Sequence, residues 1–194
     1  MKRTPTFRRI VIVVLCTIAA MSVLSVGTEF SVPYGDPIAL DRIDGVLGPE
    51  WNDANIHPCR MGRYPAEVHL KRDDRFFYVA IVVKTNQEIR GDFEGWVFLD
   101  DGDGRDYERG DDLLSVVASD GRRENADHYF KGHYDFVLDT RIGGTNDAYG
   151  AGRYHVALGA YAFEFRRELR SGDAKDVPIE DEAALDIEYG WSSG

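Results

Sequence analysis

Short apolar segments with a repeat of two residues dominate the chain from residue 37 onward. Residues 66–71 alternate strictly between apolar and polar side chains, which predicts a strand with one buried face. Residues 76–83 are apolar on both faces, so they predict a central strand. The remaining strand-like segments are residues 95–99, 113–118, a hairpin within 129–138, 154–158, 161–166 and 184–189.

Turn-forming residues separate these segments, and helical periodicity is weak. Asp44-Gly45 and Asp73-Asp74 mark two of the turns, and residues 143–152 are rich in glycine and predict a loop. No amphipathic helix longer than about two turns is indicated. About eight to ten short strands joined by turns predict an all-β fold, a two-sheet antiparallel β-sandwich of the immunoglobulin-like or jelly-roll-like kind. It occupies residues 37–194 as a single domain.

The N-terminal segment has the pattern of an export signal. Four basic residues precede an apolar run over residues 10–26, and Ser25-Val26-Gly27 offers small residues for cleavage. Residues 1–27 are therefore interpreted as a signal peptide or, because the run nearly suffices to span a bilayer, an uncleaved membrane anchor. Residues 28–36 form a tether. Both interpretations predict a secreted or extracytoplasmic domain, with the membrane contacted through this segment alone.

The strongest concentration of charge follows the predicted strand that ends at Leu99. Six aspartates lie between Asp100 and Asp112, and such crowding requires cations or basic groups for compensation. Carboxylates are ligands that calcium favours, which makes a structural calcium ion one hypothesis for this loop. The pattern is not that of an EF-hand, and a solvated turn partly neutralised by Arg105 and Arg109 is the alternative. The candidate calcium ligands are Asp101, Asp103, Asp106, Asp111 and Asp112.

Overall charge and cysteine content narrow the range of partners. The formal net charge is -11, and residues 1–27 contribute only basic groups, so the remaining domain is more acidic still. A surface of this sign repels phosphate backbones and argues against nucleic acid, whereas it is compatible with cations and neutral glycans. Without the signal segment, Cys59 has no cysteine to pair with. The domain must therefore be stabilised by its core, or by a metal.

Four motifs, in order, resemble those of a known superfamily. Residues 43–54 contain an Asp-Gly turn followed by Trp51, residues 77–81 and 97–100 form two apolar landmarks, and residues 163–173 form the fourth. Together they resemble the family-nine-like carbohydrate-binding modules within the wider superfamily that includes DOMON domains. The last motif is similar to that of the haem-binding subunits of ethylbenzene dehydrogenase. The resemblance implies a ligand held on or between two sheets, which relatives use for sugars or for haem b.

A sugar site on such a sandwich combines flat aromatic rings with polar groups that bind hydroxyls. Aromatic residues beside turns and two polar residues of the glycine-rich segment meet this description, although Trp96 and Trp191 could equally be core or edge residues. The candidate ligand-binding residues are Trp96, Tyr107, Asn146, Asp147, Tyr149 and Trp191.

Haem b is the alternative cofactor that the resemblance implies, with methionine opposite histidine or lysine as axial ligands. After removal of the signal, Met61 is the only methionine, and no Cys-x-x-Cys-His motif for covalent haem is present. The axial candidates are Met61, His69, His128, Lys131, His133 and His155.

The sequence contains no motif of nucleophilic, metallohydrolase or phosphate-transfer catalysis. A glycosidase using paired aspartates is disfavoured because adjacent strand residues face opposite ways. The sequence thus predicts a non-catalytic binding domain for a carbohydrate or cell-envelope glycan, with possible calcium. A haem b electron-transfer domain and a structural surface module without a small ligand are the alternatives. The oligomeric state is left open.

Overall fold

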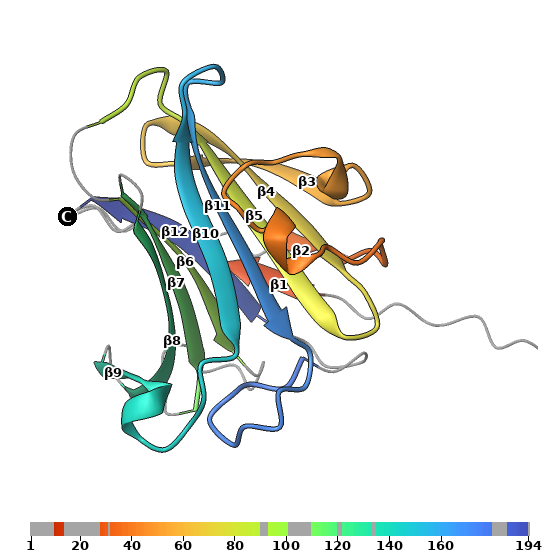
Figure 1. Ribbon diagram of the computed structural model, residues 1–194, viewed down its shortest axis with the longest axis vertical. Helices are drawn as coiled ribbons and strands as arrows, with labels where there is room; N and C mark the ends of the chain where they lie inside the picture. The colour runs from red at the N-terminus through yellow and green to blue at the C-terminus, as the bar shows by residue number, and fades with distance from the viewer. Residues whose placement is uncertain are drawn as a thin grey trace, which may run out of the picture.

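Two β-sheets facing one another make up the protein (Figure 1). The computed structural model describes residues 10–13, 28–30, 32–89, 93–100, 110–119, 122–132, 135–179 and 186–193. Helical structure in these residues consists of three single 3-10 turns, which are η1 (Leu40–Arg42), η2 (Pro49–Trp51) and η3 (Asp139–Arg141). Within the same residues, no helix is long and apolar enough to cross a membrane. The predicted all-β, two-sheet architecture is confirmed.

The five-stranded sheet has the order β10-β11-β5-β4-β3 and is antiparallel throughout. The predicted central strand, apolar on both faces, is β5 at the middle of this sheet. The strands are β3 (Asn55–Met61), β4 (Tyr64–Arg72), β5 (Phe76–Lys84), β10 (Ala148–His155) and β11 (Ala160–Glu168).

The seven-stranded sheet has the order β2-β1-β12-β6-β7-β8-β9. Its pairs are antiparallel apart from β1 with β12, which are parallel. The predicted hairpin within residues 129–138 is present as β8 and β9. The strands are β1 (Ile10–Val13), β2 (Thr28–Phe30), β6 (Phe93–Asp100), β7 (Asp112–Ser119), β8 (Arg122–Gly132), β9 (Asp135–Leu138) and β12 (Asp186–Ser193).

The main core lies between the two sheets, where alternate residues of β4, β5, β6, β7 and β11 point inward. Val79 and Ile81 of β5 contact this core together with Phe163 of β11 and Val97 of β6. All four side chains are fully buried. Removing this apolar surface from water supplies the main driving force for the fold.

A second apolar cluster explains why β5 is apolar on both faces. Residues 32–54 cross the outer face of the five-stranded sheet, where Ile38, Ile43 and Trp51 are buried against Tyr78 and Ala80 of β5 (Figure 1). This sheet is therefore covered on both sides, and its central strand has no solvent-facing row. The segment after residue 36 thus forms an outer layer on this sheet.

The glycine-rich segment 143–152 differs from its sequence prediction. Its second half belongs to β10, with Gly150 paired to Phe165 and Gly152 paired to Phe163 of β11. A Cβ atom on Gly150 would lie 2.1 Å from Cγ2 of Val116 in the opposite sheet. The glycines are present because the two sheets approach closely here, so only residues 143–147 form a loop.

Candidate functional site

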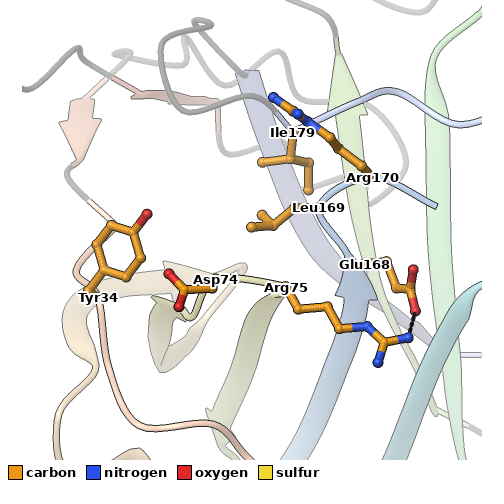
Figure 2. Close-up of a pocket in the computed structure, with 7 residues that line it drawn as sticks. All are labelled: Tyr34, Asp74, Arg75, Glu168, Leu169, Arg170 and Ile179. Carbon is orange, nitrogen blue, oxygen red and sulfur yellow. Dashed lines mark hydrogen bonds and ion pairs between the residues drawn. The ribbon is translucent and has the colours of Figure 1, made fainter. Parts of the chain in front are cut away.

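A pocket of 390 Å³ opens at one end of the five-stranded sheet (Figure 2). Its walls come from the segment before η1, the turn between β4 and β5, the end of β11 and the chain that follows β11. The lining residues are Tyr34, Asp74, Arg75, Glu168, Leu169, Arg170 and Ile179.

The β4–β5 turn is fixed by a buried aspartate. Oδ1 of Asp73 accepts hydrogen bonds from the backbone N–H groups of Arg75 and Phe76, both at 2.6 Å, and Oδ2 accepts one at 2.6 Å from the Tyr78 hydroxyl. Burial opposes ionisation of Asp73, but these hydrogen bonds outweigh it and hold its pKa below the ordinary value. An ionised Asp73 therefore orients Asp74 and Arg75 at the pocket.

Tyr34 supplies the aromatic surface of the pocket. Its segment pairs with the end of β4, since the backbone N–H of Gly35 donates to the carbonyl of Arg72 at 2.8 Å. The Arg72 guanidinium lies 4.3 Å from the centre of the Tyr34 ring, an arrangement typical of a cation–π contact. The ring is nevertheless 56% exposed. It is thus held in place while remaining accessible to a ligand.

Charged groups of both signs line the same pocket as this ring. Nη2 of Arg75 lies 2.6 Å from Oε1 of Glu168, as the dashed line in Figure 2 marks. The floor is held by backbone hydrogen bonds from Leu169 N–H to the Arg75 carbonyl at 2.8 Å and from Ile179 N–H to the Leu169 carbonyl at 2.9 Å. The pocket therefore offers donors and acceptors beside an aromatic face and two aliphatic side chains.

Two polar networks attach the crossing segment that carries Tyr34. Lys71, which is fully buried, places Nζ 2.5 Å from Oδ1 of Asp53 and 2.9 Å from the Glu50 carbonyl. Oδ2 of the same Asp53 accepts the backbone N–H of Asp36 at 2.6 Å. Since Asp36 follows Tyr34 by two residues, this network anchors the segment close to the pocket.

The second network centres on Glu164 of β11. Its carboxylate accepts hydrogen bonds from the Trp51 indole N–H at 2.6 Å and from the backbone N–H groups of Asp44 and Gly45 at 2.8 and 2.6 Å. Burial nevertheless raises the pKa of Glu164 to about 7, because these hydrogen bonds only partly compensate for lost hydration. The Asp-Gly turn and the tryptophan of the first sequence motif are thus joined by one buried glutamate.

The residues predicted for sugar binding do not gather into one described site. Trp96 is half-buried in β6, and Asn146 is exposed ahead of β10. Tyr149 is half-buried and packs against the outer-face cluster around Trp51. Asp147, half-buried, donates its backbone N–H to Asp127. Tyr107 and the side chain of Trp191 lie outside the described residues. The glycine-rich platform therefore stays a prediction, and the pocket at Tyr34 was missed.

The predicted calcium ligands are only partly described. Asp101, Asp103 and Asp106 lie outside the described residues. Asp111 and Asp112 are buried, and Asp112 points into the sandwich, where its Oδ2 lies 2.8 Å from Nη2 of Arg167. Asp112 thus contacts residues far away in the sequence.

The candidate haem ligands lie on different faces. Met61 belongs to the core between the sheets, whereas His69 lies beside Trp51 on the outer face of the same sheet. His155 bonds the Gly45 carbonyl through Nε2 at 2.6 Å, and His128 packs edge-on against Phe136. Lys131 is exposed, and His133 lies outside the described residues. Haem b binding stays a prediction.

Comparison with known proteins gives a likeness in fold. No family model matches the chain, and no curated protein matches it significantly. Two solved structures of a family 9 carbohydrate-binding module from Caldicellulosiruptor kristjanssonii, in complex with cellotriose and with glucose, are 20% and 17% identical with TM-scores of 0.42 and 0.35. Each match covers 71% of this chain, and 65% and 66% of the respective modules, just under two thirds.

Proposed function

We propose that the protein is a non-catalytic, extracytoplasmic binding module for a carbohydrate or cell-envelope glycan, and that a sugar ring binds against Tyr34. One observation carries the proposal: an anchored but exposed tyrosine ring lines a 390 Å³ pocket together with charged side chains of both signs. The four sequence motifs that resemble family-nine-like modules support the same ligand class. The location rests on the N-terminal signal or anchor pattern.

The chemistry of the pocket suits a neutral, hydroxyl-rich ligand. An aromatic face buries the C–H groups of a sugar, and adjacent charged side chains bind its hydroxyls. The volume lies within the range of about 300–1,000 Å³ that is typical of small-molecule sites. Arg75 and Glu168 neutralise one another, and the acidic chain repels polyanions.

Binding without catalysis is proposed because one of the two pocket carboxylates, Glu168, is held in an ion pair. Asp74 and Glu168 both line the pocket, but Glu168 is held by the Arg75 guanidinium at 2.6 Å. A glycosidase requires a protonated carboxyl group to donate to the leaving oxygen. A carboxylate held in an ion pair is poorly placed to donate that proton.

A glycan array followed by calorimetry on the best soluble oligosaccharide tests the proposal. Tyr34→Ala is expected to weaken binding at least about tenfold, since it removes the stacking face. Phe136→Ala is the matched control, because Phe136 is an exposed aromatic residue of β9 in the other sheet. Its affinity should equal that of the unmodified protein.

Three outcomes would contradict the proposal. The first is an array with no bound glycan, and the second is binding that survives Tyr34→Ala but is lost in Tyr149→Ala, which would move the site to the glycine-rich segment. The third is a Soret absorption band with stoichiometric iron, which would favour the haem b alternative.

A further inference from the structure

Five aspartates converge at the end of the sandwich where β11 finishes. They come from β7, β8, η3 and the loop that follows β11, so distant parts of the sequence supply them. In Figure 1 the η3 turn (cyan) and the loop after β11 (blue) lie at the lower end of the molecule. The aspartate cluster consists of Asp112, Asp127, Asp139, Asp173 and Asp176.

One side of the aspartate cluster already has a cation. Nη2 of Arg167 lies 2.8 Å from Oδ2 of Asp112 and 3.4 Å from Oδ2 of Asp176. Nη1 of the same guanidinium donates to the Val177 carbonyl at 2.7 Å. Asp127 is stabilised separately, because its Oδ2 accepts the backbone N–H groups of Asp147 and Ala148, both at 3.1 Å.

The other side is formed by Asp139, Asp173 and Asp176, of which Asp176 shares Arg167 while Asp139 has no hydrogen-bond partner among the described residues. One oxygen from each carboxylate lies within 4.8 Å of the others. Asp139 has no solvent-accessible surface, and neither of its carboxylate oxygens has a hydrogen-bond partner among the described residues. An isolated buried carboxylate is strongly unfavourable unless a cation or a proton compensates it.

We propose that Asp139, Asp173 and Asp176 bind a hard divalent cation, for which calcium is the best fit. All three ligands are carboxylate oxygens, which calcium prefers, and they come partly from a loop that can adapt to its variable geometry. This site shares none of these three aspartates with the 101–112 loop. The argument for an ion at these aspartates does not rest on the proposed sugar binding.

Water can reach part of the site. Asp173 is only half-buried, so water has access to complete the coordination shell. Gly144 closes the site: a Cβ atom there would lie 2.9 Å from Oδ2 of Asp173 and 3.1 Å from Cβ of Asp139. Lys175 does not fill the space with its ammonium group, whose Nζ lies over the Tyr129 ring at 5.2 Å from its centre.

The electrostatics of the apo site agree with this geometry. Burial, followed by the negative charges of Asp127, Asp176 and Asp173, raises the pKa of Asp139 to about 7. Asp173 is held instead by donors: Oδ1 accepts the Lys175 N–H at 2.8 Å and Oδ2 accepts the Thr145 N–H at 2.5 Å. Asp139 is thus buried, and Asp173 is held by hydrogen bonds, without a bound ion.

Calcium titration of the full chain, followed by calorimetry and by thermal unfolding, tests the proposal. At free calcium 100-fold above Kd, the unfolding midpoint is expected to rise by about 5–10 °C relative to chelator. Asp139→Asn should abolish this rise while leaving the midpoint in chelator unchanged or higher, because it removes a buried unpaired charge. Asp173→Asn, at a more exposed ligand, should also abolish the rise.

The matched control is the double variant Asp103→Asn/Asp106→Asn in the 101–112 loop, which should bind calcium like the unmodified protein. Two results would overturn the proposal. One is an unchanged midpoint and no binding heat in millimolar calcium. The other is calcium binding that survives both Asp139→Asn and Asp173→Asn but is lost in the loop variant.

Discussion

Arg167 and Asp112 form a buried ion pair that joins the two sheets. Arg167 belongs to β11 of the five-stranded sheet and Asp112 to β7 of the seven-stranded sheet, with 2.8 Å between Nη2 and Oδ2. Their side chains are 1% and 0% exposed. Arg167 also contacts Asp176. One guanidinium therefore links β11 to β7 and to the loop that follows β11.

Replacing this arginine should destabilise the fold strongly. Arg167→Met keeps much of the aliphatic volume but leaves Asp112 and its neighbours without a cation, and we expect a loss of about 3–5 kcal/mol in the free energy of unfolding. Urea unfolding measures it. Arg75→Met is the control, because the exposed Arg75–Glu168 pair should contribute less than about 1 kcal/mol. Equal effects of the two substitutions would contradict the assignment.

Close approach of the sheets at Gly150 leads to a second prediction. Gly150→Ala would force a Cβ atom against Val116 and the Glu164 carbonyl, so it should lower the free energy of unfolding by about 1–3 kcal/mol. Val156→Ala, at an 83% exposed turn position, should change it by less than about 0.5 kcal/mol. A neutral Gly150→Ala would show that the sheets can separate locally, contrary to the packing described.

The pattern of apolar and polar residues predicts the strands. It does not predict where a glycine allows the two sheets to pack closely. The alternation in residues 66–71 and the apolar run 76–83 specify β4 and β5, because strand periodicity is a property of neighbouring residues. Gly150 and Gly152 were assigned to a loop, since the same residue type permits turns and close sheet contact. Only the opposite strand, more than 30 residues away in β7, distinguishes these roles.

The candidate sites depend even more on contacts between residues that are far apart in the sequence. Tyr34 was placed in a tether, and only its pairing with Arg72 shows that it lines a pocket. The acidic run 100–112 predicts a metal site because its aspartates are close together in the sequence. Asp139, Asp173 and Asp176 are far apart in the sequence and give no such pattern. Spacing along the chain carries no information on such clusters. Among the described residues, the buried Asp112 is the predicted metal ligand that belongs to the aspartate cluster.

Glu164 should make stability depend on pH. The unfolded chain loses this proton near the ordinary pKa of 4.5, whereas the folded protein retains it to about 7. Stability from this group is therefore present below pH 4.5 and declines as the pH rises to about 7, by about 3 kcal/mol in total. Asp44 contributes through its negative charge, and His155 bonds the adjacent Gly45 carbonyl.

Glu164→Gln removes this titration while preserving the shape of the side chain. The difference in unfolding free energy between the unmodified protein and the variant should shrink steadily across this window and then become constant. Urea unfolding at several pH values measures it, with exposed Glu88→Gln as the control for loss of one carboxylate. A pH-independent difference would mean that Glu164 is already ionised throughout the window.

Calcium removal should weaken glycan binding if both proposals hold. The chain after β11 carries Asp173 and Asp176 of the aspartate cluster between Arg170 and Ile179, which line the pocket. An ion that fixes the two aspartates would restrict both pocket residues, so chelator should lower the affinity for the oligosaccharide at least about fivefold. Asp139→Asn should show the lower affinity in calcium and in chelator alike, whereas Phe136→Ala should respond to calcium as the unmodified protein does. Calorimetry with and without calcium measures this coupling, and identical affinities despite bound calcium would show that the loop holds its shape without the ion.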